Sequence, residues 1–306
     1  MPPSDPPTLS PATDPVPARA GDSGVRGILW MLLTMVQFVS MDVLAKHLQQ
    51  FMPVVEVVWA RYLFHLVLLV VLFRHHLPAK MRTTRLSLQL GRSLLLLATT
   101  TLFFTGLGYI QIATAATMMY AAPLIVTSLS LPLLGERVGP RRWAGVVVGF
   151  AGALIILRPG TEAMQLAALL PMGAATLYAL YQITTRLLSQ SDPPSTTLIY
   201  TASVGVVVMS AAVPFFWVAP TPQQWGLMAV MGLLGGTGHF TLIKAFQAAP
   251  AATVTPFGYS SLIWATLFGF LAFGDLPDAW TVTGALVIVG SGLYIFHREQ
   301  RRNTKI

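Results

Sequence analysis

The sequence contains ten long apolar runs, and their length limits the chain to one class of fold. A helix needs about 20 mostly apolar residues to cross the ~30 Å hydrocarbon layer of a membrane. Continuous apolar runs favour helices over the alternating strands of a membrane barrel. We therefore predict an all-α integral membrane protein with ten transmembrane helices. These are expected near residues 27–47, 54–73, 88–108, 112–134, 142–158, 166–187, 196–218, 223–244, 252–273 and 280–297.

The composition agrees with a membrane protein and argues against several functional classes. Of the 306 residues, 54% are hydrophobic and 10% are charged, whereas soluble domains carry about 25% charged residues. The chain has no cysteine, which excludes a disulfide framework, a thiolate metal site and a cysteine nucleophile. We find no Walker loop, nucleophile elbow or zinc-protease motif. We therefore predict no enzyme activity, no catalytic residue, no cofactor and no bound metal, and transport would have to be driven by gradients.

The distribution of lysine and arginine predicts the orientation in the membrane. Basic residues are enriched in cytoplasmic loops. If the N-terminus is cytoplasmic, only Lys46 and Arg158 lie outside, while Arg61 lies within a span. This asymmetry explains the net charge of +8, because the basic residues lie at the cytoplasmic surface of the membrane, next to its lipid. We therefore predict no nucleic-acid partner. We expect a multi-pass protein of a bacterial-type inner membrane with both termini cytoplasmic, and Lys46 and Glu56 solvated near the outer mouth.

Two similar loops indicate an internal repeat. GERVGPRRWAG at 135–145 and GDLPDAWTVTG at 274–284 each follow an apolar run, and ATAATMMYAAP at 113–123 is similar to APAATVTPFGY at 249–259. Each half then contains five spans, and an odd number turns the second half over. The basic loop would face the cytoplasm and the acidic loop would face outside. Inverted repeats of this kind are typical of secondary transporters, which bind substrate near the midplane between the repeats.

The predicted organisation has four parts. Residues 1–25 are rich in Pro and Ser and are expected to be a disordered cytoplasmic segment. The five-helix repeats should occupy 26–158 and 159–298, and 299–306 should form a basic cytoplasmic tail. The sequence is compatible with a monomer.

The repeated motifs resemble a known family. Arg61, Gly135-Glu136-Arg137 and the stretch PFGYSSLIWATLFGFLAFGDLPDAWTVTGALVIVGSGLYI at 256–295 are similar to the drug/metabolite transporter superfamily, with two EamA-type halves. Asp275 stands where the family usually has Glu. The resemblance implies an inner-membrane secondary transporter that exports small amphipathic metabolites by alternating access around a central cavity. Within the superfamily, the chain resembles inner-membrane exporters of amino acids, including aromatic ones.

Other functions stay open at this point. The cargo could be another metabolite, such as an adenosyl compound, or a drug-like cation, moved in either direction. A membrane-embedded enzyme or a lipid-handling scaffold is the alternative from another class. Such an enzyme would need convergent acid, base or metal groups at one depth, and only Asp42 with Arg61 comes close.

Asp42 and Arg61 are the first candidates for substrate binding or gating. They are predicted at a similar depth in the first two spans, about 10 Å below the surface. Ionisable groups inside a membrane usually pair or line a watery cavity. Arg61 could hold a substrate carboxylate and Asp42 an ammonium group or a proton; the alternative is a structural ion pair. His65 and His239 could relay protons, or could simply bond a neighbouring helix.

Polar and aromatic residues of four spans form the second set of candidates. The first, fourth, sixth and ninth spans are pseudo-symmetric partners that could enclose a pocket stacking a ring and bonding a polar backbone. The alternative is ordinary packing or an interfacial belt. These candidates are Gln37, Ser40, Thr117, Tyr120, Tyr178, Tyr181, Gln182, Tyr259, Ser260 and Trp264.

Prolines and glycines mark two further expectations. Pro123 and Pro256 should kink their helices. GVVVGFAGA at 145–153 and GALVIVGSG at 284–292 place small residues at the spacing of helix contacts, which predicts a rigid packing pair. Four glycines between 232 and 238 should permit close approach or bending of the eighth span.

Overall fold

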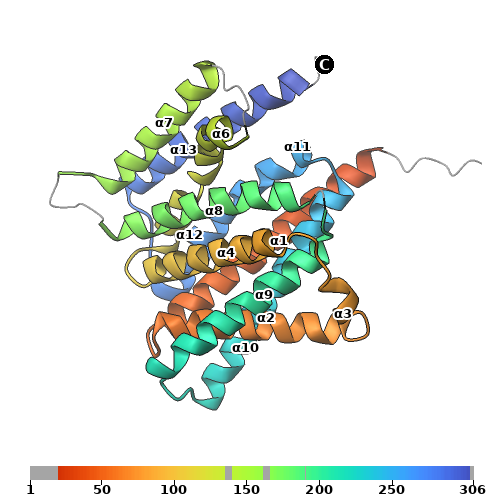
Figure 1. The fold of residues 1–306 in the computed structure, drawn as a ribbon. Coiled ribbons are helices and arrows are strands. Elements are labelled where there is room, and N and C mark those ends of the chain that lie inside the picture. Colours follow the sequence, from red (N-terminus) through yellow and green to blue (C-terminus); the bar gives the residue numbers. More distant parts are fainter. Residues whose placement is uncertain (1–19, 135–139, 161–165, 190, 304–306) are drawn as a thin grey trace, which may run out of the picture.

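The computed structural model describes residues 20–134, 140–160, 166–189 and 191–303 (Figure 1). Within these ranges the ordered elements are helices, and no strand occurs. Nine described helical stretches are long and apolar enough to cross a membrane, and Trp143–Leu157 is a shorter apolar helix. The described part of the chain therefore confirms the predicted all-α membrane fold.

Each repeat contributes five crossings. The first contains α1 (Ala20–Leu48), α2 (Val54–Phe73), the short α3 (Leu77–Lys80), α4 (Leu86–Leu107), α5 (Ile112–Met119), α6 (Ala122–Leu134) and α7 (Pro140–Leu157). The second contains η1 (Leu166–Ala168), α8 (Leu169–Leu188), α9 (Pro194–Ala212), η2 (Val213–Phe215), α10 (Pro222–Ala248), α11 (Ala251–Val254), η3 (Thr255–Ser260), α12 (Ser261–Phe273) and α13 (Ala279–Asn303).

The ends of the chain differ from the predicted tails. Helix α1 begins at Ala20, so residues 20–25 are helical rather than disordered. Helix α13 continues to Asn303 and takes in most of the predicted basic tail. Residues 1–19 and 304–306, and the Gly135-Glu136-Arg137 motif of the basic loop, lie outside the described residues.

The fourth and ninth crossings are both interrupted by a break in the α-helix. Helix α5 ends at Met119, and α6 restarts at Ala122 with Pro123 in its first turn. In the ninth crossing, Pro256 lies in the 3-10 segment η3, between α11 and α12. Proline lacks the N–H that a continuous helix requires, so the backbone changes geometry beside it. Both crossings therefore contain a stretch of backbone that is not continuous α-helix.

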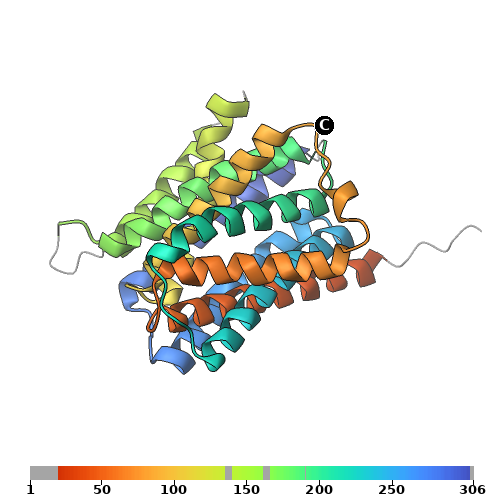
Figure 2. The same cartoon turned by 60° about the horizontal axis from the view of Figure 1, so that its bottom comes forward.

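Helices of one repeat pack mainly on helices of the other (Figure 2). Helix α1 packs on α10 and α4 packs on α8, and these two pairs are equivalent under the exchange of repeats. Helix α2 packs on α9, α5 on α12 and α7 on α13, so each of these crossings meets its own counterpart. This pattern is that of two intertwined halves related by a pseudo-twofold axis.

The contact between α7 and α13 confirms that the second repeat is inverted. Ile295 fills the space where a side chain of Gly145 would lie, and Ile156 does the same at Gly284. The start of α7 therefore lies beside the end of α13, and the two helices are antiparallel. The first residues of α7, which belong to the basic loop, and the acidic loop before α13 therefore lie at opposite ends of the bundle. The small residues of both helices pack against each other, as predicted.

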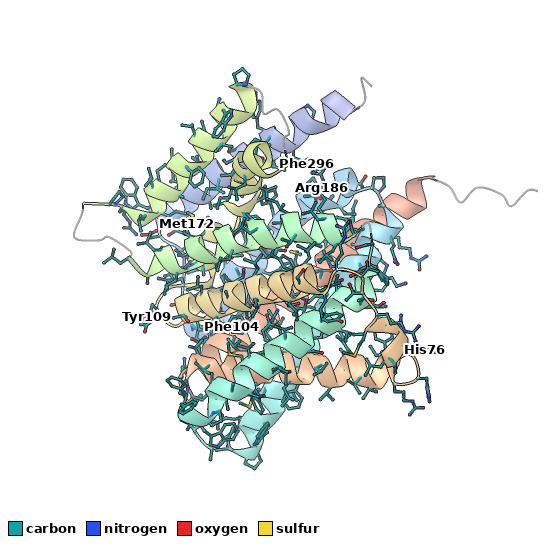
Figure 3. The ribbon with its side chains drawn as sticks, viewed as in Figure 1. His76, Phe104, Tyr109, Met172, Arg186 and Phe296 are labelled. Atoms are coloured by element: carbon teal, nitrogen blue, oxygen red, sulfur yellow. The ribbon has the colours of Figure 1, made fainter. Side chains whose placement is uncertain are left out.

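The bundle has two ends, which we call the terminal end and the distal end. The terminal end carries the described chain ends and the connection 74–85 (Figure 1). The distal end carries the connections 49–53, 108–111 and 274–278. Figure 3 places His76 at the terminal end, Tyr109 at the distal end and Phe104 among the packed helices between them.

Candidate functional site

Arg61 is a buried cation with hydrogen-bonding capacity to spare. It lies on α2, is 5% exposed, and faces α1, α4 and α10. Its Nε donates to the sulfur of Met41 at 3.4 Å, and its guanidinium lies 6.0 Å from the ring centre of Phe104. Its Nη1 is buried and has no hydrogen-bond partner among the described residues. A buried unpaired donor is costly, so Arg61 stays a candidate for substrate binding.

Two histidines lie one turn further along the same interface. The rings of His65 on α2 and His239 on α10 are stacked, with centres 5.8 Å apart, and Phe38 packs edge-on against His239 at 5.2 Å. Nε2 of His65 is buried without a hydrogen-bond partner in the described chain. Glycine makes this contact possible, because a Cβ on Gly236 would lie 2.9 Å from the His65 ring. Close approach is thus the role of this glycine.

Asp42 is also buried in this region, at 9% exposure. It forms no ion pair within 4 Å with Arg61 and no hydrogen bond with any residue that the structure describes. The two described ion pairs are instead Lys46–Asp275 and Arg158–Asp278. An acid and a base therefore share one interface without neutralising each other directly.

Gln37, beside this group, makes hydrogen bonds that join α1 to α10. Its Nε2 donates to Thr237 at 3.1 Å, and its Oε1 accepts from Thr241 at 2.7 Å. Thr34 donates to Thr241 at 2.9 Å, which extends the ladder between α1 and α10. These bonds use the polar groups of Gln37 to join the helices. Ser40 is partly buried on the same helix.

The interrupted helices bring a second group together. The Tyr120 hydroxyl donates to the carbonyl of Gly258 at 2.6 Å and lies 2.6 Å from the Ser261 hydroxyl. The rings of Tyr120 and Tyr259 are 4.6 Å apart. Tyr120 thus connects the break in the fourth crossing to the break in the ninth.

The ninth crossing also carries two unused polar atoms. Ser260 Oγ and Trp264 Nε1 are buried and lack hydrogen-bond partners among the described residues. Trp264 packs on the same apolar cluster as Met41 and Phe104, which flank Arg61. Trp264 of the ninth crossing and the two residues that flank Arg61 therefore belong to one apolar cluster.

Arg92 is a buried arginine that we did not select from the sequence. It is 3% exposed on α4, and its Nη2 donates to the Tyr181 hydroxyl at 2.6 Å. Its other donors reach Thr185 at 2.7 Å, Thr201 at 2.8 Å and the carbonyl of Thr197 at 3.3 Å. The count of lysine and arginine placed it on the cytoplasmic side, although the predicted span 88–108 contains it. The signal that could have found it is its place within an apolar run.

The remaining candidates lie in different surroundings. Tyr178 stacks on Tyr181 with ring centres 5.4 Å apart, and so belongs to the Arg92 region. Thr117 donates to the carbonyl of Ala113 in its own helix. Gln182 is partly buried on α8. The role of all these residues in substrate binding stays a prediction.

The distal end corrects the expectation that Lys46 and Glu56 are solvated. Lys46 Nζ lies 2.8 Å from Asp275 Oδ2 and donates to the Ile110 carbonyl at 3.0 Å. Glu56 is fully buried and accepts from the Val218 backbone at 3.1 Å. Their partners are more than sixty residues away in sequence, which is why the local pattern did not reveal them. Lys46 and Asp275 also border a pocket of about 530 Å³.

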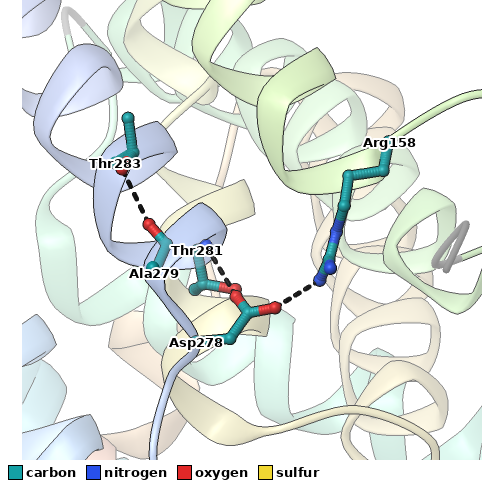
Figure 4. Close-up of polar contacts among 5 residues, drawn as sticks. All are labelled: Arg158, Asp278, Ala279, Thr281 and Thr283. Atoms are coloured by element: carbon teal, nitrogen blue, oxygen red, sulfur yellow. Dashed lines mark hydrogen bonds and ion pairs between the residues drawn. The ribbon is translucent and has the colours of Figure 1, made fainter.

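Asp278 at the same end is held by two donors (Figure 4). Its Oδ1 accepts from the Thr281 backbone at 2.8 Å, and Arg158 pairs with its Oδ2. Partial burial alone would raise the pKa of this carboxyl, but the bonds from Thr281 and Arg158 outweigh it and lower the pKa below its usual value.

Comparison with known proteins places the chain in a family. The sequence model of the EamA-like transporter family matches residues 25–158 and 165–296. An S-adenosylmethionine uptake transporter of Rickettsia bellii is 28% identical over 279 residues, covering 91% of this chain and 96% of the relative. A riboflavin transporter of Vibrio cholerae is 30% identical over 287 residues, covering 92% and 96%.

An exporter is among the relatives as well. The pseudopaline exporter CntI of Pseudomonas aeruginosa is 26% identical over 268 residues, covering 86% of this chain and 93% of the relative. Relatives named for uptake and for export therefore match nearly the whole chain. The family match spans both halves of the described bundle, and the chain belongs to the EamA-like transporter family, a group of multi-pass membrane transporters.

Proposed function

We propose that this transporter moves a small amphipathic metabolite with a carboxylate and an aromatic ring by alternating access around the core between the repeats. The observation that carries the proposal is the buried Nη1 of Arg61, which has no partner in the described chain. Arginine binds carboxylates through two parallel N–H donors. A substrate carboxylate would therefore complete the hydrogen bonding of Arg61.

Surrounding residues would contact the other parts of the substrate. Asp42 has no hydrogen bond with a described residue and would take an ammonium group. Trp264 and the Tyr120–Tyr259 pair would face the ring, since pockets for such ligands combine apolar and aromatic walls with a few polar groups. His65 and His239 would line the wall between α2 and α10.

Amino acids, including aromatic ones, are the first candidates, moving outward across a bacterial inner membrane with the terminal end in the cytoplasm. The second candidate is an adenosyl amino acid, which also combines a carboxylate, an ammonium group and an aromatic ring. It is favoured by the similarity to relatives named for S-adenosylmethionine uptake.

Counterflow into proteoliposomes tests these candidates. Vesicles containing the purified chain would be preloaded with unlabelled solute and given labelled phenylalanine, tryptophan, S-adenosylmethionine or riboflavin. Accumulation of either aromatic amino acid supports the first candidate, and accumulation of S-adenosylmethionine alone supports the second. Riboflavin carries no carboxylate, so transport of riboflavin alone would contradict the role given to Arg61. Export is tested by release of the amino acid from overexpressing cells.

A further inference from the structure

The distal end is crossed by two ion pairs that use both acids of the loop 274–278. Lys46, in the last turn of α1, pairs with Asp275, and Arg158, just after α7, pairs with Asp278. The two bases are the ones that the charge distribution leaves outside. In each pair the base belongs to the first family match and the acid to the second. The pairs therefore join one repeat to the other.

Both pairs are attached to helix ends. Lys46 also donates to the Ile110 carbonyl just before α5, and its ammonium lies 5.0 Å from the ring centre of Phe273 at the end of α12. Asp278 caps the first turn of α13 through the Thr281 backbone (Figure 4). A relative movement of the repeats at this end would be transmitted directly to the charged groups.

We propose that Lys46–Asp275 and Arg158–Asp278 form a distal latch, which closes the transport path at this end and breaks whenever the path opens there. The inference rests on the proposed function. Partly exposed ion pairs are individually weak, so the latch can open and close in each cycle. Side chains of Lys46 and Asp275 are 16% and 29% exposed, which fits contacts made at the edge of the core.

The terminal end is joined in a different way. There the acid Asp192 accepts from Thr83 and Gln89, both at 2.6 Å, and Lys80 donates to Ser195 at 3.2 Å. In each of these described contacts between repeats, a charged side chain bonds a neutral one, so none of the three is an ion pair. The acidic sequence of the distal loop thus has a specific use: it supplies partners for the two bases of the opposite repeat.

Crosslinking tests the latch directly, because the chain has no native cysteine. A Lys46→Cys/Asp275→Cys variant would be treated with a short bifunctional methanethiosulfonate and assayed by counterflow. We expect at least a tenfold loss of transport that a reducing agent reverses. A matched control is Thr221→Cys/Gln224→Cys, which links two residues of one helix start in the same repeat. Full transport in the crosslinked Lys46/Asp275 variant would overturn the proposal.

Labelling gives a readout that does not need transport. Thr114 borders the distal pocket but is 2% exposed, so a cysteine there should react slowly with an impermeant maleimide. In the Thr114→Cys background, Lys46→Gln with Asp275→Asn should raise the labelling rate at least threefold, and the swap Lys46→Asp with Asp275→Lys should restore it. An unchanged rate in the neutral variant would overturn the latch. Failure of counterflow in the unmodified protein would instead reject the proposed function.

Discussion

Arg61 and Arg92 are both buried inside the helical bundle, yet their guanidinium groups differ in how many hydrogen bonds they make. Arg92 donates to three side chains and one backbone carbonyl drawn from α8 and α9. Arg61 donates to one methionine sulfur and keeps a buried nitrogen unpartnered among the described residues. A satisfied buried charge holds helices together, whereas an unsatisfied one is costly unless something binds it. We therefore propose that Arg92 is structural and that Arg61 is available to a substrate.

The largest expected effect is on transport by the Arg61→Ala variant. Losing a charge-assisted contact to a carboxylate should lower transport about 100-fold, or roughly 3 kcal/mol. Thermal stability in detergent should change much less than transport, because the one described hydrogen bond that the variant removes is the weak contact with the Met41 sulfur. Counterflow and thermal unfolding, measured on the same preparation, check both. A loss of stability as large as the loss of transport would make Arg61 a structural residue like Arg92.

Arg92→Met should lose more stability and less transport than Arg61→Ala. The variant retains most of the volume but removes hydrogen bonds between α4, α8 and α9, which should cost about 2 kcal/mol of unfolding free energy. Thermal unfolding in detergent is the measurement. Transport per folded molecule should change less than in Arg61→Ala. If Arg92→Met unfolds like the wild type, the proposed division between the two arginines is wrong.

Tyr181→Phe sharpens the comparison with a smaller change. It removes the hydroxyl that accepts from Arg92 and keeps the ring that stacks on Tyr178. We expect a loss of about 1 kcal/mol in unfolding free energy. In the Arg92→Met background the same change should cost almost nothing, which a double-mutant cycle can measure. Additive losses would contradict the coupling.

The smallest effect concerns acid stability at the distal end. The lowered pKa of Asp278 means that its stabilising contribution is present above the ordinary aspartate pKa of about 4 and is lost as pH falls through the folded value. Asp278→Asn should therefore lower stability slightly at pH 7 and differ less from the wild type at pH 3. Thermal unfolding across this range is the measurement. An equal difference at both pH values would count against a role for the ionised carboxylate.

The fold could be predicted from the sequence much further than the candidate site. Helix positions follow from apolar length, and the inversion follows from an odd number of crossings in each repeated half, so both are local or repetitive signals. Arg92 was missed because the charge count placed it on the cytoplasmic side, although it lies inside the predicted span 88–108. Lys46 and Glu56 were misjudged because Asp275 and Val218, which contact them, come from the other repeat. Distances between remote residues decide the site, and they depend on the packing of the two halves.

Binding of matched carboxylate and amide ligands tests the central claim most directly. The binding of phenylalanine and phenylalaninamide, and of tryptophan and tryptophanamide, would be measured by thermal shift in the wild type and in Arg61→Ala. The wild type should bind the carboxylate at least about tenfold more tightly than the amide, and Arg61→Ala should lose that preference. If Arg61→Ala keeps the wild-type preference for the carboxylate, Arg61 does not hold the substrate and the proposed central site is wrong.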